Sequence, residues 1–137
     1  MTSVATYIAF PGNAKEAFEH YKDVLGGELH LMTYGTTQME GMPFTPPADA
    51  VAHAELHTPG GIIAGADAME EVPVKDTAYS MLLTVDTVEE GRALIEKFLA
   101  GGGSMNLPFE LAPWGQYYGQ VFDRFGVMWS LSVPPTA

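Results

Sequence analysis

Two segments of the chain repeat the same order of sequence signals, and this repeat limits the possible folds more than any other feature. In the first segment, a short apolar run from Thr6 to Phe10 precedes a helix-like stretch that stops at Gly26. In the second, residues 80–85 precede a similar stretch that stops at Gly101. Apolar residues recur at helical spacing in both stretches, which predicts one amphipathic helix in each repeat.

Capping signals predict where these helices begin. Asn13 precedes the first helix, where its side-chain oxygen is expected to accept from a free N–H group of the first turn. Thr87 precedes the second helix and forms a capping-box pattern with Glu90. With glycines as stop signals, the predicted helices are residues 14–25 and 88–100.

Three candidate strands follow each helix. In the first repeat they are residues 28–34, 51–57 and 61–66. In the second repeat they are residues 104–107, 117–122 and 127–133. The sequence therefore predicts an α+β fold of two βαβββ modules, at about residues 4–68 and 78–133, within a single domain spanning residues 1–137.

Composition narrows the classes of partner. The chain has 137 residues, with 17 Asp and Glu against 6 Lys and Arg, a formal net charge of -11. Such a surface disfavours nucleic acid and anionic membranes, so we expect neither as a partner. The absence of cysteine excludes disulfides and thiolate chemistry. No signal segment or apolar run of membrane-spanning length is recognisable, so a cytoplasmic location is expected.

The repeat and several short motifs resemble a known family. The motifs are residues 7–14, 18–22, 25–27, 53–56, 114–115 and 123–129. The chain resembles the vicinal oxygen chelate superfamily, which includes glyoxalase I, bleomycin-resistance proteins and ring-cleaving dioxygenases, and within it the PhnB-like branch. The resemblance implies two curled mixed sheets around a cleft, with the helices on the outer face. It also implies a homodimer.

The resemblance further implies where a metal would bind, because metal-dependent members hold a divalent ion on the first and last strands of each module. Those positions fall on Thr6, Ser80, Ser130 and residues 64–66 of this chain. Hydroxyls and alanines are poor ligands for such an ion. We therefore predict that the usual metal site is absent and that no cofactor is needed. A displaced divalent metal stays open, with Asp67 the one carboxylate near this position in the first module.

His53, Glu55 and His57 are the candidates for catalysis. They alternate along one predicted strand, so all three lie on one face, opposite to the apolar face made by Ala54 and Leu56. A histidine beside a glutamate on the cleft side could do acid–base work. The alternatives are an unusual metal site and a partly solvated strand on which a histidine simply hydrogen-bonds Glu55.

The candidates for ligand binding come from the metal positions and from an aromatic segment. They are Thr6, Ser80, Trp114, Gln116, Tyr117 and Ser130. Aromatic planes flanked by polar tips suit a small organic ligand, although the same segment could belong to the core or to a dimer interface.

Two functions from different classes fit these features. The first is a small-molecule-binding protein of the bleomycin-resistance kind, without a metal and with an unknown ligand. The second is a glyoxalase- or isomerase-type enzyme that uses Glu55 and a neighbouring histidine. A structural or interaction module, with its cleft filled by its own side chains, is a third. The fold alone does not choose between them.

Overall fold

The computed structural model describes residues 2–35, 47–68 and 73–134. The chain divides into two compact units, residues 1–73 and 74–137, each of which contains one of the predicted modules. No helix in the described parts of the chain is both long enough and apolar enough to span a membrane.

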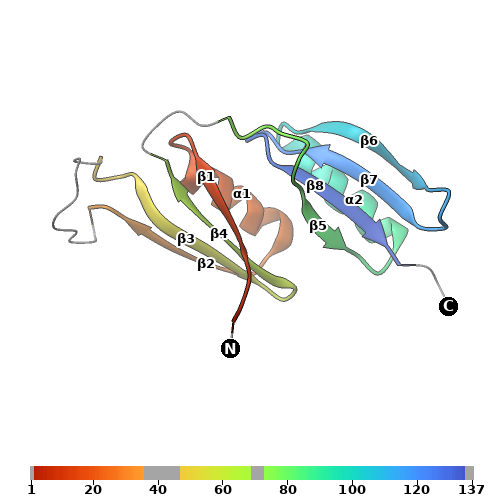
Figure 1. Ribbon diagram of the computed structural model, residues 1–137, viewed down its shortest axis with the longest axis horizontal. Helices are drawn as coiled ribbons and strands as arrows, with labels where there is room; N and C mark the ends of the chain where they lie inside the picture. Colours follow the sequence, from red (N-terminus) through yellow and green to blue (C-terminus); the bar gives the residue numbers. More distant parts are fainter. Residues whose placement is uncertain (1, 36–46, 69–72, 135–137) are drawn as a thin grey trace. The chain divides into compact units, whose positions relative to one another are not determined.

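The first module is a four-stranded sheet with one helix (Figure 1). Its elements are β1 (Thr6–Phe10), α1 (Ala14–Leu25), β2 (Glu28–Thr33), β3 (Val51–Thr58) and β4 (Gly61–Asp67). The strand order is β1-β4-β3-β2. β1 runs parallel to β4, and the remaining pairs are antiparallel.

The second module repeats this topology. Its elements are β5 (Met81–Thr84), α2 (Val88–Ala100), β6 (Ser104–Leu111), β7 (Tyr117–Phe122) and β8 (Met128–Val133). The strand order is β5-β8-β7-β6, again with one parallel pair. The predicted α+β class and the two βαβββ modules are thus confirmed. β6 extends past the predicted end at Leu107, because Glu110 and Leu111 pair with the start of β7.

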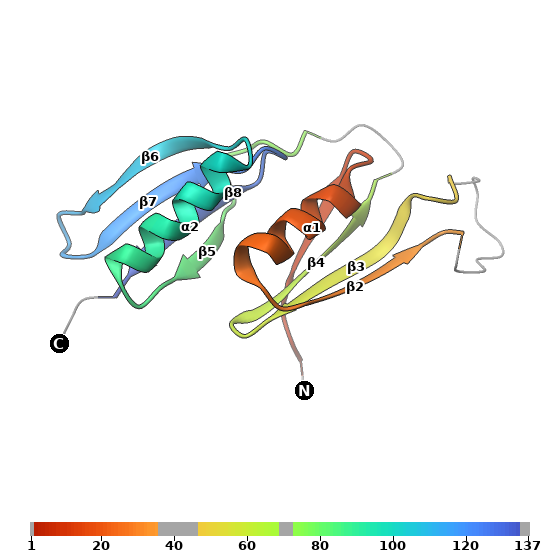
Figure 2. The ribbon, with the colours of Figure 1, turned by 180° about the vertical axis from the view of Figure 1, so that it is seen from behind.

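Each helix lies across one face of its own sheet (Figure 2). Under α1, Gly65 of β4 gives the room that this close packing needs: a Cβ atom there would lie 3.1 Å from the Phe18 ring. The apolar side chains Phe10, Phe18, Ala54 and Leu56 are fully buried in this core. Because side chains alternate across a strand, the residues between them fall on the opposite face of the sheet.

Phe109 of β6 has the corresponding role in the second module. A Cβ atom at Gly91 of α2 would come within 2.7 Å of its ring, and one at Gly119 of β7 would come within 2.7 Å of its backbone. Phe98 of α2 stacks on Trp129 of β8, with 5.0 Å between the ring centroids. These contacts place the helix on the face of the sheet that carries Trp129.

The start of α1 differs from the prediction. Asn13 makes no side-chain capping hydrogen bond. Instead the Ala14 N–H donates to Oδ1 of Asp67 (2.8 Å), whose Oδ2 accepts from the Val51 N–H (2.9 Å). Asp67 is buried, so a carboxylate from β4 ties the helix start to β3. At α2 the capping prediction is confirmed, because Thr87 Oγ1 accepts from the Glu90 N–H.

This difference predicts unequal effects of two alanine substitutions. Asp67→Ala leaves two backbone N–H groups without their acceptor and should lower the free energy of unfolding by about 2–4 kcal/mol. Asn13→Ala removes no capping bond and should change it by less than about 0.5 kcal/mol. Urea denaturation followed by circular dichroism measures both. A larger loss for Asn13→Ala would contradict the assignment of the cap to Asp67.

Candidate functional site

Four side chains form a continuous cluster on the face of the first sheet opposite to α1. Nε2 of His53 lies 2.7 Å from Oε2 of Glu55, and Nε2 of His57 lies 2.8 Å from Oε1 of the same carboxylate. The Tyr7 hydroxyl lies 3.4 Å from Nδ1 of His53. We call Tyr7, His53, Glu55 and His57 the histidine cluster.

The strand register explains why a residue of β1 reaches a residue of β3. Tyr7 is paired with Ala64 of β4, and Ala64 is paired with Glu55 of β3. Because the intervening side chain is only a methyl group, the Tyr7 ring can extend across β4 and stack on His53, with 5.8 Å between the ring centroids. The side chains of His53, Glu55 and His57 are 34%, 36% and 42% exposed. The cluster is therefore open to a ligand.

The charges in the cluster follow from these contacts. Hydrogen bonds with His53 and then with His57 lower the pKa of Glu55 below its ordinary value of 4.5, against a smaller opposing effect of desolvation. Burial, followed by the nearby Tyr34, raises the pKa of Tyr7 above 10.0. At neutral pH, Glu55 is thus an ionised acceptor and Tyr7 is a neutral hydroxyl.

The second module carries a different polar chain on the face opposite to α2. Its hydrogen bonds run in one direction: Asn106 donates to Gln120 (2.7 Å) and Gln120 to the Tyr118 hydroxyl (3.0 Å). Tyr118 then donates to Ser130 (3.1 Å), and Ser130 to Ser80 (2.7 Å). We call these five residues the serine chain. All five are neutral.

The structure separates the residues that were predicted to bind a ligand. Ser80 and Ser130 are joined in the serine chain. Trp114 is exposed and lies 6.1 Å from Tyr118, between ring centroids. Thr6, in contrast, is paired with Ile63 and so falls on the α1 side of its sheet.

Tyr117 falls on the α2 side, since its ring lies 5.8 Å from that of Phe109. Gln116 is half-buried in the turn before β7, where its carbonyl oxygen accepts from the Ala112 N–H.

Tyr7 and Tyr118 are the aromatic residues that sequence reasoning missed. Each is the immediate neighbour of a predicted residue, Thr6 or Tyr117, and lies on the open face in its place. The position of Tyr118 could have been predicted, because side chains alternate along a strand and Tyr118 therefore shares a face with Gln120. For Tyr7, the signal was weaker, because a five-residue strand with one polar end leaves its register open.

The described residues do not fit the metal site of the metal-dependent relatives. Within residues 2–35, 47–68 and 73–134 there is no group of three His, Asp or Glu side chains that could hold an ion. His53 and His57 both direct Nε2 at Glu55, which occupies the carboxylate oxygens. The oxygens of Asp67, the other candidate, are occupied by backbone N–H groups. The absence of a metal stays a prediction that only a binding measurement tests.

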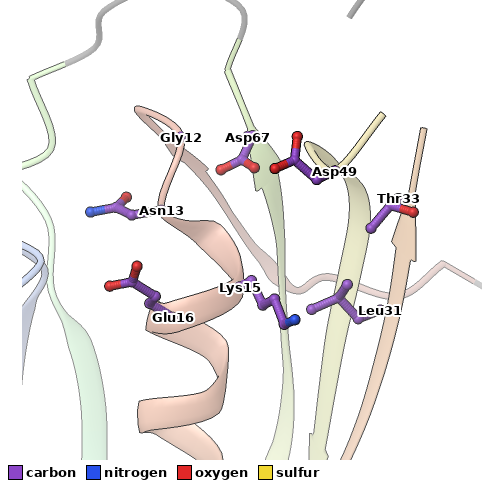
Figure 3. Close-up of a pocket in the computed structure, with 8 residues that line it drawn as sticks. All are labelled: Gly12, Asn13, Lys15, Glu16, Leu31, Thr33, Asp49 and Asp67. Carbon is purple, nitrogen blue, oxygen red and sulfur yellow. The ribbon is translucent and has the colours of Figure 1, made fainter. Parts of the chain in front are cut away.

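A cavity of about 300 Å³ lies near the start of α1 (Figure 3). Its lining residues are Gly12, Asn13, Lys15, Glu16, Leu31, Thr33, Asp49 and Asp67. Leu31 is paired with Ala54, which is buried against α1. The cavity is therefore on the opposite side of the sheet from the histidine cluster.

Comparison with known proteins defines the class. The family model of the Glyoxalase/Bleomycin resistance protein/Dioxygenase superfamily matches residues 3–131. This chain belongs to that superfamily, which confirms the resemblance seen in the sequence.

Three known proteins are similar to this chain over nearly their whole length. Protein YjdN of Escherichia coli (strain K12) is 29% identical, over 95% of this chain and 94% of its own. The crystal structure of protein PA1353 from Pseudomonas aeruginosa is also 29% identical, with a TM-score of 0.81, over 99% of this chain and 100% of its own. The PhnB protein from Bacillus cereus is 22% identical, with a TM-score of 0.75, over 97% and 100% of the two chains. At that identity, the likeness to PhnB concerns the fold.

The lowered pKa of Glu55 predicts how stability depends on pH. Because ionisation of Glu55 favours the folded state, its contribution is complete above the ordinary value of 4.5 and is lost as the pH falls through the lowered pKa. Glu55→Gln should therefore be less stable than the unmodified protein at neutral pH, and the difference should shrink in acid. Urea denaturation across this range measures it.

Glu28→Gln is the matched control, because it makes the same change at an exposed position of the adjacent strand, 3.6 Å from His30. A constant difference between Glu55→Gln and the unmodified protein at every pH would contradict the assigned hydrogen bonds of Glu55.

Proposed function

We propose that the protein binds a small organic molecule at the histidine cluster, without the divalent metal of its metal-dependent relatives. The observation that carries this proposal is the hydrogen-bonded row of Tyr7, His53, Glu55 and His57 on an open sheet face. The row offers polar atoms in fixed positions beside the exposed apolar side chains of Met32 and Ile62. A few fixed polar groups among apolar ones are typical of small-molecule sites.

The strand register supports placing those apolar side chains at the same site. Met32 is paired with His53, and Ile62 is paired with His57, so both flank the cluster on the neighbouring strands. Apolar contact would supply affinity, while the polar row would fix the orientation of the ligand. The serine chain of the second module is a second polar face on which Ser80 and Ser130, with Trp114 nearby, could contact a ligand.

Native mass spectrometry of untagged protein, purified without chelators, tests this proposal. We expect a small-molecule adduct in the purified protein and no stoichiometric uptake of zinc, nickel, manganese or iron(II) when each is added. The double variant Tyr7→Phe/His57→Gln should lose the adduct, while Glu19→Gln, at an exposed position of α1 on the other side of the sheet, should keep it. One tightly held metal ion per chain would overturn the metal-independent function.

An acid–base enzyme of the glyoxalase or isomerase kind is the second candidate. The observation that favours it is the carboxylate of Glu55 held between two imidazoles, an arrangement that can orient a histidine for proton transfer. Incubation with a metabolite extract, followed by mass spectrometry, separates the candidates. If the protein consumes many molecules per chain, and if His57→Gln abolishes this consumption but still binds the molecule, the enzyme is the better supported candidate. Stoichiometric binding without consumption would leave the binding protein.

We also propose that the protein is a cytoplasmic homodimer. What supports a dimer is that, within the part of the chain that the structure describes, β1, β2, β5 and β6 each pair with a neighbour on one side only. This leaves strand edges to be covered. The same native mass spectra test the dimer, because the mass of the assembly gives the number of chains. A monomer at micromolar concentration would contradict it.

A further inference from the structure

The hydrogen bonds of the histidine cluster determine where its protons lie. An ionised carboxylate only accepts hydrogen bonds. Glu55 faces Nε2 of both His53 and His57, so each neutral imidazole must carry its proton on Nε2. Nδ1 is then the acceptor nitrogen of each ring. The cluster thus holds both histidines in the same tautomer.

This assignment also orients the Tyr7 hydroxyl. Nδ1 of His53 has no proton to offer, so at 3.4 Å Tyr7 must be the donor of that hydrogen bond. The hydroxyl proton of Tyr7 is therefore used in this hydrogen bond, and the Tyr7 oxygen can only accept a hydrogen bond from a ligand. Nδ1 of His57 has no hydrogen-bond partner among the described residues and offers a lone pair as well.

The charges around the cluster also favour a ligand that donates hydrogen bonds and carries no negative charge. The four strands of this sheet contain no Lys or Arg. Two of its carboxylates, Glu28 and Glu55, lie on the open face. An anionic ligand would meet acceptors and negative charge there, with no Lys or Arg of the sheet to compensate.

From these observations we infer that the histidine cluster binds a neutral or positively charged molecule, which donates hydrogen bonds to the Tyr7 oxygen and to Nδ1 of His57. This inference rests on the proposed function and adds the chemical class of the ligand: amines, amides or hydroxyl compounds with an apolar part, and not carboxylates or phosphates. Glu55 acts in this site as a positioning residue, because it sets the tautomer of both histidines without contacting the ligand.

Histidine nitrogen resonances test the tautomers without any ligand. At about pH 8, where neutral imidazole is the ordinary form, long-range 1H–15N spectra should show both His53 and His57 protonated on Nε2. Glu55→Gln should move at least one of them toward a mixture of tautomers, and Glu28→Gln should move neither. Tyr7→Phe should shift Nδ1 of His53 and leave His57 unchanged. Protonation of either ring mainly on Nδ1 would overturn the inference.

Three aromatic probes of similar size test the ligand class at the same pH: benzylammonium, phenol and benzoate. Benzylammonium and phenol should shift Nδ1 of His57, and benzoate should bind at least about tenfold more weakly. Equal or tighter binding of benzoate would overturn the inference. So would a co-purified ligand that is an anion, although the proposed function would then stand. Binding of no probe and no co-purified molecule would overturn the proposed function itself.

Discussion

The close approach of one helix to one face of each sheet is the constraint on which the rest of the structure depends. In the first module, Gly65 lets the ring of Phe18 descend onto β4. In the second, Gly91 and Gly119 make room for Phe109. Once one face is filled by a helix, alternation along each strand assigns every second residue to the core and leaves the others on the open face. Both polar clusters are products of this division.

The two modules share a topology but differ in the chemistry of their open faces. In the first module a single ionised carboxylate arranges two imidazoles and, through one of them, a phenol. In the second, five neutral groups form a chain of hydrogen bonds in which Ser80 is the last acceptor. A charged centre fixes the protonation of its neighbours, whereas a chain of hydroxyls and amides can reverse direction when a ligand arrives. The first face is therefore the more selective for the charge of a ligand.

Features that depend on neighbours within one segment could be predicted from the sequence. Periodicity and glycine stops placed both helices at their observed bounds, 14–25 and 88–100. The period of two placed His53, Glu55 and His57 on one face, opposite to the buried Ala54 and Leu56. The interaction of Glu55 with both histidines also depends on one segment only, because the three residues share a strand.

Features that depend on the order of the strands could not be predicted in this way. Tyr7 meets His53 only because β4 lies between their strands and carries Ala64 at that point. Asp67 replaces Asn13 as the helix cap only because the end of β4 lies beside the start of α1. A register error of one residue moved the expected site position from Tyr7 to Thr6, and from the open face to the core face.

The charge of the histidine cluster bears on the choice between binding and catalysis. A reaction that builds up negative charge on its substrate needs a metal ion, a cation or a set of hydrogen-bond donors at that position. The available atoms of the cluster, the Tyr7 oxygen and Nδ1 of His57, are acceptors, and Glu55 adds a negative charge. Such a site can hold a donor-rich molecule and accept a proton from it, but it offers little stabilisation to the anion left behind. Recognition is therefore the role that this arrangement supports more directly than turnover.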